Sequence, residues 1–277
     1  MLKKVVVLFH RRAKLSQRGE EARWMLKNWV GKGGETFRAM RVFKGVMGIF
    51  IVIGASSGIG KELAAQLVGA GHEVIGTYFS ANEESGTLGV PMHRLNVLDE
   101  NPDFSFIPEA INGLAYCPGA INLKPFARTK PDDFRVDYEL QLIGAVKTIQ
   151  AALPALKKSG AGSVVLFSTV AVQSGFGFHA IVSASKGAIE GLGRTLAAEL
   201  APTVRVNVVA PSLTDTPLAA PLLGNEERRA SSAQRHPMKR VGTAADSASA
   251  AKFLLSNESG WMTGQVIHVD GGMGVVR

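Results

Sequence analysis

Cysteine is nearly absent from this 277-residue sequence, which contains only Cys117. A single thiol cannot form an internal disulfide bond, so the chain fits a reducing compartment, and we expect it in the cytoplasm. No apolar run approaches the roughly 20 residues that a membrane helix needs, so we expect no membrane partner. Hydrophobic residues make up 46% of the sequence, which is enough for a sizeable core.

Acidic residues are scarce at the start of the chain. Residues 1–46 contain 12 Lys and Arg against 3 Glu, a net charge of +9, whereas the remainder contains 19 basic and 20 acidic residues. A nucleic-acid-binding protein carries its basic patch on a folded face, so we expect no nucleic-acid partner. We interpret 1–46 as a basic N-terminal extension, either native or translated from a start upstream of a native start at Met47, and 47–277 as the folded domain. A membrane or nucleic-acid role of the extension is the alternative.

A glycine-rich turn follows the first strongly apolar run. The run 49–53 ends at Gly54, and a helix-like sequence begins near Gly58. Because glycine has no Cβ atom, such a turn lets backbone N–H groups and a helix N-terminus approach a phosphate. A strand, a glycine turn and a helix in this order are the context of a dinucleotide-binding fingerprint. The sequence therefore predicts a dinucleotide site, with a purely structural turn as the alternative.

Strand-like and helix-like segments alternate along the rest of the chain. Strands are predicted at 49–54, 73–78, 92–97, 113–117, 163–167, 204–209 and 266–269. Helices are predicted at 58–69, 132–158 and 183–200. This alternation predicts an α/β fold, a doubly wound, Rossmann-like parallel sheet with helices on both faces, in a single domain. Ligands are expected at the carboxyl ends of its strands. The proline-containing segment 214–234 is predicted to be a mobile insertion over that edge.

Four sequence motifs occur in a characteristic order. They are Gly54-Ala-Ser-Ser-Gly-Ile-Gly60, Ser183-Ala-Ser-Lys-Gly-Ala188, Arg205-Val-Asn-Val-Val-Ala-Pro211 and Met262-Thr-Gly-Gln-Val-Ile-His-Val-Asp-Gly-Gly272. With these motifs, residues 48–273 resemble the short-chain dehydrogenase/reductase family, of the kind related to acyl-carrier-protein ketoreductases. The resemblance implies a nicotinamide cofactor and hydride transfer between a carbonyl and an alcohol.

The usual catalytic residues of that family are Asn, Ser, Tyr and Lys. The tyrosine transfers the proton, the lysine lowers the pKa of the tyrosine and holds the nicotinamide ribose, and the serine hydrogen-bonds to the reacting oxygen. Lys186 matches the lysine. Thr169, with Ser168 beside it, stands at the serine position, and Gln141 stands at the asparagine position.

The sequence departs from the family pattern at the tyrosine. Val182 occupies that position, four residues before Lys186. General acid–base catalysis typically contributes about 100- to 10,000-fold, so the proton needs another carrier. His179 is of the right chemical type, although a loop histidine without a role is the simpler interpretation, and Lys186 itself or a water held by Thr169 are the alternatives. The catalytic candidates are Thr169, Lys186, Ser168 and His179.

The cofactor-binding positions of the family are better preserved than the catalytic ones. The matching residues are Gly54, Ser56, Ser57, Gly58, Ile59, Gly60, Asn96, Val97, Cys117, Pro118, Gly119, Lys186, Thr214 and Thr216. The segment Thr77-Tyr78-Phe79-Ser80 ends the second predicted strand without a carboxylate to repel a 2′-phosphate or an arginine to bind one. We expect NAD(P), with NADP(H) slightly preferred over NAD(H), and no metal.

These observations predict an NAD(P)(H)-dependent oxidoreductase that acts on a small carbonyl or alcohol substrate with atypical proton handling. Val182 leaves an alternative open, a catalytically inactive NAD(P)-binding sensor or partner subunit. The resemblance also implies a homo-oligomer, a dimer or tetramer packed through helices 132–158 and 183–200. Small residues on these helices would permit close helix approach: Gly144, Ala145, Ala188, Gly191 and Gly193.

Overall fold

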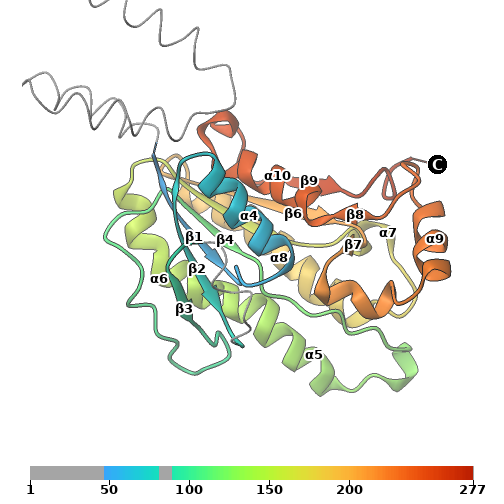
Figure 1. The fold of residues 1–277 in the computed structure, drawn as a ribbon. Coiled ribbons are helices and arrows are strands. Elements are labelled where there is room, and N and C mark those ends of the chain that lie inside the picture. The colour runs from blue at the N-terminus through green and yellow to red at the C-terminus, as the bar shows by residue number, and fades with distance from the viewer. Residues whose placement is uncertain (1–46, 81–88, 277) are drawn as a thin grey trace, which may run out of the picture. The chain divides into compact units, whose positions relative to one another are not determined.

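The computed structural model describes residues 47–80 and 89–276, so the interpretation of 1–46 lies outside the described residues. A seven-stranded sheet, in the order β3-β2-β1-β4-β5-β6-β9, forms its centre, and all neighbouring strands are parallel (Figure 1). The strands are β1 (Ile49–Ile53), β2 (Glu73–Tyr78), β3 (Met92–Arg94), β4 (Gly113–Tyr116), β5 (Gly162–Phe167), β6 (Val204–Pro211) and β9 (Val266–Val269). The predicted doubly wound α/β fold is confirmed.

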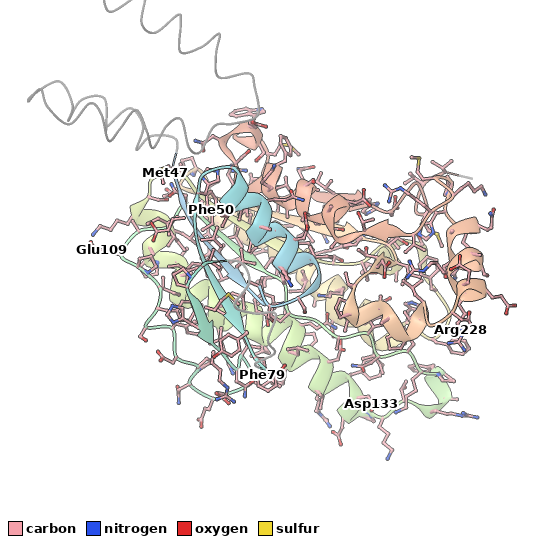
Figure 2. All side chains as sticks on the ribbon, in the orientation of Figure 1. Met47, Phe50, Phe79, Glu109, Asp133 and Arg228 are labelled. Carbon is pink, nitrogen blue, oxygen red and sulfur yellow. The ribbon has the colours of Figure 1, made fainter. Side chains whose placement is uncertain are left out.

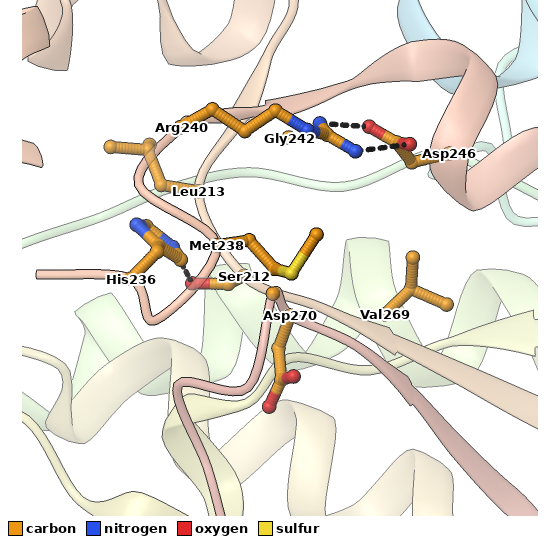
Figure 3. A pocket seen from close by; sticks show the side chains of 10 residues that line it. Ser212, Leu213, His236, Met238, Arg240, Gly242, Asp246, Val269 and Asp270 are labelled. Atoms are coloured by element: carbon orange, nitrogen blue, oxygen red, sulfur yellow. Dashed lines mark hydrogen bonds and ion pairs between the residues drawn. The ribbon is translucent and has the colours of Figure 1, made fainter. Parts of the chain in front are cut away.

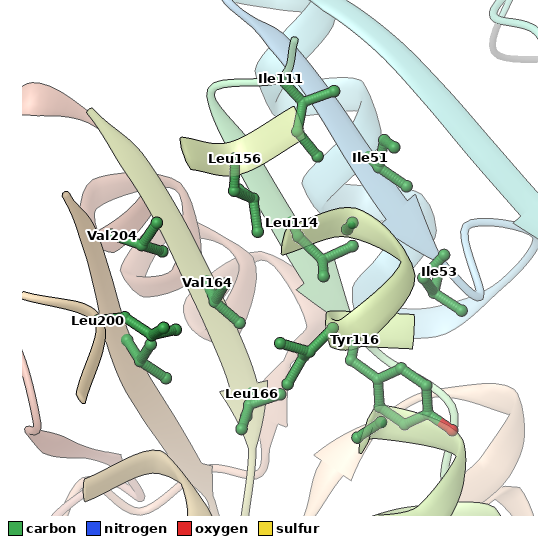
Figure 4. Close-up of a cluster of buried hydrophobic side chains, with 14 of the residues drawn as sticks. Ile51, Ile53, Ile111, Leu114, Tyr116, Leu156, Val164, Leu166, Leu200 and Val204 are labelled. Carbon is green, nitrogen blue, oxygen red and sulfur yellow. The ribbon is translucent and has the colours of Figure 1, made fainter. Parts of the chain in front are cut away.

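Helices cover both faces of the sheet because alternate strand residues point to opposite sides. On β1, Phe50 and Val52 join a hydrophobic cluster with α4 (Gly58–Gly69) and α10 (Ala244–Leu255). Ile51 and Ile53 join the cluster on the other face, beneath α6 (Gly144–Lys158) and α8 (Ala180–Leu200) (Figure 4). The strand order reverses at β1, which pairs with β2 on one side and β4 on the other. The carboxyl ends of β1 and β4 therefore flank the crevice where this fold binds ligands.

The largest differences between predicted and observed element boundaries concern one strand and two helices, and other strand ends differ by one or two residues. Strand β3 ends at Arg94 rather than at residue 97, and α8 begins at Ala180 rather than at residue 183. The predicted helix 132–158 consists of α5 (Pro131–Tyr138), a π-helical turn η3 (Glu139–Ile143) and α6.

Helix α10 was not predicted from the sequence. Its alanine- and serine-rich composition gives little helical periodicity. A capping box between Thr243 and Asp246 marks its start, and that short signal would have revealed the helix.

Several small residues that were expected to lie at an oligomer interface instead pack within the subunit, beginning with Gly144 at the π turn. Tyr116 donates its hydroxyl to the carbonyl of Leu140 within the turn, at 2.6 Å. A Cβ atom on Gly144 would lie 2.3 Å from that hydroxyl oxygen, and one on Gly193 would lie 2.8 Å from Val208. Ala145 is fully buried in the same core cluster. The expectation that Gly144, Ala145 and Gly193 face a second subunit is wrong, because they pack against their own sheet.

The segment 214–234, predicted as a mobile insertion in which prolines precede a charged helix, contains regular elements, and its charged helix is confirmed. It contains β7 (Thr214–Asp215), which pairs with β8 (Gly242–Thr243), followed by η4 (Pro217–Leu222) and α9 (Glu226–Gln234). Ala219 and Leu223 pack with Val241 in a small separate core. The remaining short elements are η2 (Phe126–Arg128), α7 (Ala171–Ser174) and η5 (Asn257–Ser259). Within the described residues, no helix is both long and apolar enough to span a bilayer.

Candidate active site

The glycine turn after β1 has a backbone that only glycine adopts readily. Gly54 and Gly58 have φ angles of +76° and +54°, in the left-handed region. A Cβ atom on Gly60 would lie 2.2 Å from the carbonyl oxygen of Gly54, so no larger residue fits there. These constraints keep the turn tight and its backbone accessible to a ligand.

The N-terminus of α4 has no side chain that caps it. Ser57 stands at the N-cap with an extended backbone, and its hydroxyl makes no capping hydrogen bond. No acidic residue lies in the first turn. The first N–H groups of a helix have no partner within the helix and carry a partial positive charge. This end of α4 therefore fits an anion such as a pyrophosphate.

The predicted cofactor residues from three different loops lie side by side. A Cβ atom on Gly54 would lie 3.3 Å from Pro118, and one on Gly60 would lie 3.2 Å from Cys117. A Cβ atom on Gly58 would lie 3.4 Å from Thr216. The loops after β1, β4 and β6 thus meet at the carboxyl edge of the sheet, as a nicotinamide dinucleotide requires. The missing side chains at these glycines allow the three loops to approach one another this closely.

Other predicted cofactor residues use their side chains within the protein. Asn96 donates its amide to Asp99 at 2.6 Å and accepts from the N–H of Leu98 at 3.2 Å. Val97 is buried. Thr214 donates its hydroxyl to the carbonyl of Ser212 at 2.9 Å, and Thr216 donates to the carbonyl of Thr214 at 3.3 Å. Their roles toward a cofactor remain predictions.

The end of β2, where the ribose 2′ position is expected, carries no carboxylate among its described residues. Strand β2 ends at Tyr78, and Phe79 and Ser80 follow it. Phe79 is 60% exposed, and Figure 2 labels it next to the end of this strand. Thr77 is buried and accepts a hydrogen bond from the N–H of Gly54 at 3.0 Å, which ties β2 to the glycine turn.

The two hydroxyl residues after β5 have different environments. Ser168 is buried and donates to Glu190 Oε1 at 2.7 Å, so its proton is committed to that carboxylate. The hydroxyl oxygen of Thr169 accepts from the N–H of Ala171 at 3.3 Å. This arrangement leaves the Thr169 hydroxyl proton available to a ligand.

Lys186 is a buried cation with only 8% of its surface exposed. Burial lowers the pKa of its ammonium group to about 8, and the negative charge of Asp137 opposes that lowering. Desolvation raises the pKa of the Cys117 thiol to about 12. Val182, one helical turn before Lys186, is also buried and supplies no proton-carrying group.

A buried polar cluster beside Lys186 was only partly found from the sequence. Asp137, 1% exposed, accepts from Asn122 at 2.9 Å and from the amide of Gln141 at 2.6 Å. The other atom of that amide, Gln141 Oε1, is buried and has no hydrogen-bond partner among the described residues. The signal for Asp137 was its position four residues before Gln141, on the same helix face.

His179 stands at the N-cap of α8 and is tied to its own loop. Its Nδ1 atom donates to the carbonyl of Gly177 at 2.7 Å, and its ring contacts Phe176 edge-on at 5.5 Å between centroids. In this tautomer Nε2 is an acceptor. No hydrogen bond joins His179 to Thr169 or Lys186 in the described parts of the chain.

A second group of polar residues lines a pocket between the ends of β6 and β9 (Figure 3). His236 is buried, and its Nδ1 atom donates to the carbonyl of Ser232 at 2.8 Å. Its Nε2 atom therefore accepts from the hydroxyl of Ser212 at 2.9 Å. Asp270 instead accepts from the N–H groups of Gly272 and Gly274. The histidine thus connects the end of α9 to the loop after β6, and sequence reasoning did not identify it.

No cluster of three or more metal-ligating side chains occurs in the described ranges, 47–80 and 89–276.

A family model described as enoyl-(acyl carrier protein) reductase matches residues 54–274. The 3-oxoacyl-[acyl-carrier-protein] reductase FabG of Salmonella typhimurium is 31% identical over 244 residues, which cover 82% of this chain and 98% of that protein. A tropinone reductase homolog of Arabidopsis thaliana is 39% identical over 166 residues, which cover 60% of this chain and 63% of that protein.

Solved structures share the fold over most of the chain. The ligand-free aldohexose dehydrogenase of Thermoplasma acidophilum has a TM-score of 0.77 at 27% identity, covering 82% of this chain and 94% of its own. The structure of ElxO with NADP bound has a TM-score of 0.73 at 25% identity, covering 82% and 98%. The chain therefore belongs to the short-chain dehydrogenase/reductase family and is an oxidoreductase, and this family membership supports binding of a nicotinamide cofactor.

Proposed function

We propose that the protein transfers hydride between NADP(H) and a small carbonyl or alcohol substrate, with Lys186 taking over the proton transfer that a tyrosine performs in its relatives. The observation that carries this proposal is the buried Lys186 ammonium, whose pKa of about 8 suits a general acid near neutral pH. The nicotinamide, when bound, supplies or accepts the hydride.

The protein's own residues would perform three tasks in this reaction. The glycine turn and the N-terminus of α4 hold the pyrophosphate. Thr169 donates its free hydroxyl proton to the carbonyl oxygen of the substrate and orients it. Lys186 delivers a proton to that oxygen during reduction, directly or through a water molecule that Thr169 holds, and takes it back during oxidation.

His179 is a weaker candidate for the proton carrier. Its Nδ1 atom already donates to the carbonyl of Gly177, so only Nε2 could exchange a proton with a substrate. A reduction routed through His179 would need the imidazolium form, whereas Lys186 is cationic at neutral pH. We therefore keep His179 as the residue to be tested against Lys186.

The preference for NADP(H) rests on the end of β2. The described residues Tyr78, Phe79 and Ser80 place no carboxylate against a 2′-phosphate. We expect NADP(H) to bind more tightly than NAD(H) in calorimetric titrations at one ionic strength. Equal or tighter binding of NAD(H) would remove this part of the proposal.

Val182 favours a second function. In this alternative the protein is a nicotinamide-binding sensor or a partner subunit without turnover. The residues around the pyrophosphate site are the same in both functions, and Lys186 would also be retained to hold the ribose. Only the chemistry at the substrate carbonyl separates the two possibilities.

The deciding experiment combines cofactor binding with a substrate screen. Wild type, Lys186→Ala and His179→Ala are assayed with NADPH and NADH on ketones, aldoses and 3-oxoacyl thioesters, the last two chosen because similar proteins act on them by name. We expect turnover in the wild type and in His179→Ala, and its loss in Lys186→Ala. Tight nucleotide binding without turnover on any substrate would favour the sensor.

A further inference from the structure

Asp137 is a buried charged group that the reaction outlined above does not yet use. It lies on α5, on the helix turn that precedes the π turn, with 1% of its surface exposed. A buried charge is costly unless it is paired and hydrogen-bonded. Its presence in the core of the candidate site therefore calls for compensating partners, and the structure provides two kinds.

The first kind of partner is a pair of amide donors. Asn122 donates to one carboxylate oxygen of Asp137 at 2.9 Å, and Gln141 donates to the other at 2.6 Å. Both oxygens act as acceptors, which is the hydrogen-bonding pattern of an ionised carboxylate. Because the Gln141 nitrogen is committed to Asp137, its oxygen must point the other way.

That oxygen faces the space beside Lys186. Gln141 Oε1 is buried and unpartnered within the described residues. A Cβ atom on Gly119 would lie 3.4 Å from it and 3.6 Å from Lys186 Nζ, so the acceptor and the ammonium border the same gap. No described residue accepts a hydrogen bond from Lys186 Nζ either. A ligand hydroxyl in this gap would accept from Lys186 and donate to Gln141.

The second compensation is electrostatic and comes from the charge of Lys186, which forms no ion pair with Asp137 within 4.0 Å in the described residues. The negative charge of Asp137 acts on the ammonium and keeps its pKa higher than burial alone would allow. Cys117, on the loop after β4, is a neutral thiol where Lys186 titrates, because burial raises its pKa to about 12. Glu190, one turn after Lys186 on α8, is occupied by Ser168, Gln173 and Arg194. Asp137 is therefore the carboxylate through which α5 acts on Lys186.

We propose that Asp137 is a positioning residue of the active site: its carboxylate holds Gln141 with the amide oxygen toward Lys186 and serves as the buried counter-charge of the lysine. This inference rests on the proposed role of Lys186. It assigns a function to a residue that lies outside the Ser, Tyr and Lys machinery of the family, and it does not require Asp137 to touch the substrate.

The test follows the titration of Lys186 in the protein without cofactor or substrate. Lysine labelled with ¹³C and ¹⁵N reports the ionisation of each ammonium by NMR, and Lys186→Met identifies the signal. In Asp137→Asn we expect the Lys186 midpoint to fall by about one pH unit, since an opposite charge has been removed. Asp132→Asn, an exposed acid on the same helix, serves as the matched control and should leave the midpoint unchanged.

A purely structural Asp137 would give a different result. The variant would lose stability while the Lys186 midpoint stayed at its wild-type value, and that outcome would overturn the proposal. Because this measurement needs no turnover, an inactive protein in the substrate screen does not affect it.

The double variant Asp137→Asn/Lys186→Met covers the case in which Asp137→Asn does not fold. If the two residues are counter-charges, removing the second partner should restore a large part of the denaturation midpoint lost with the first. Additive losses would show that the two charges are independent and would also contradict the proposal.

Discussion

At the scale of single residues, the function depends on which group carries the proton in place of the tyrosine hydroxyl. The family resemblance places Val182 where the proton-transferring tyrosine is expected, and Lys186 and Thr169 at the lysine and serine positions. Burial gives Lys186 a pKa of about 8, which a solvent-exposed lysine would not have. The same desolvation that makes this lysine costly to bury gives it the pKa that the proposed role as proton carrier requires near neutral pH.

Introducing a tyrosine at position 182 tests whether the remaining catalytic residues are correctly placed. We expect Val182→Tyr to raise carbonyl reduction by about 100-fold, the lower end of typical general acid–base contributions. Steady-state rates with NADPH give the measurement. Val182→Phe is the matched control, because it adds the same ring at this buried position without the hydroxyl, and it should show no gain. Equal rates in both variants would mean that the tyrosine position no longer addresses the substrate.

The pH dependence of the reaction should follow Lys186. Reduction needs the ammonium form as proton donor, so its rate should be constant below about pH 8 and fall at higher pH. Oxidation needs the neutral amine, so its rate should rise up to the same pH and then level off. Lys186→Arg keeps the charge but does not titrate in this range. Wild type and Lys186→Arg with identical profiles would exclude Lys186 as the proton carrier.

At the scale of elements, the bent helix α5–η3–α6 is what shapes the site. The π turn places Gln141 and Asp137 toward Lys186, and Tyr116 satisfies a carbonyl of the turn from β4 below it. The close approach requires a residue without a side chain at Gly144. The turn is therefore held by specific contacts with the sheet.

Alanine substitutions at two helical glycines should have opposite effects. Gly144→Ala places a Cβ atom 2.3 Å from the Tyr116 hydroxyl, so we expect a loss of about 1–3 kcal/mol in unfolding free energy from overpacking. Gly191→Ala meets nothing within 4 Å and should gain about 0.5–1 kcal/mol, as a helical glycine replaced by alanine does. Urea denaturation measures both. A Gly144→Ala protein as stable as Gly191→Ala would show that the π turn relaxes freely.

At the scale of the whole molecule, the parallel sheet brings distant loops together. The loops after β1, β4, β5 and β6 end at one edge because all strands of the sheet run in the same direction. Residues as far apart in sequence as Gly58 and Thr216 consequently approach each other. The site is therefore a property of the complete sheet.

The predicted assembly also belongs to this scale. We propose a dimer or tetramer through α5, α6 and α8. Among the small residues of these helices, Gly191 has open space beside it, whereas Gly144, Ala145 and Gly193 face the core. Sedimentation analysis at micromolar concentration should show a mass at least twice the 29.4 kDa of the chain. A monomer across the accessible concentration range would contradict the proposal.

The fold and the phosphate turn follow from the sequence because their signals are local. Alternating strands and helices, and glycines between β1 and α4, carry their meaning within a few residues. Helix α10 escaped prediction because its composition lacks a periodic apolar stripe, although its capping box was readable. The sequence also left both Ser168 and Thr169 as catalytic candidates, because two neighbouring hydroxyl residues cannot be told apart until their hydrogen bonds are known.

The sequence by itself determined the family and its dinucleotide-type glycine turn, and it predicts that Val182 replaces the usual tyrosine, since both depend on residue identity at fixed positions. Only the tertiary structure decided that Ser168 is committed to Glu190 and that Lys186 is a buried cation. It alone placed Asp137 and Gln141 with Lys186 at one site. Burial and pairing depend on segments that are far apart in the chain, and a local pattern contains no record of which partner each polar group will find.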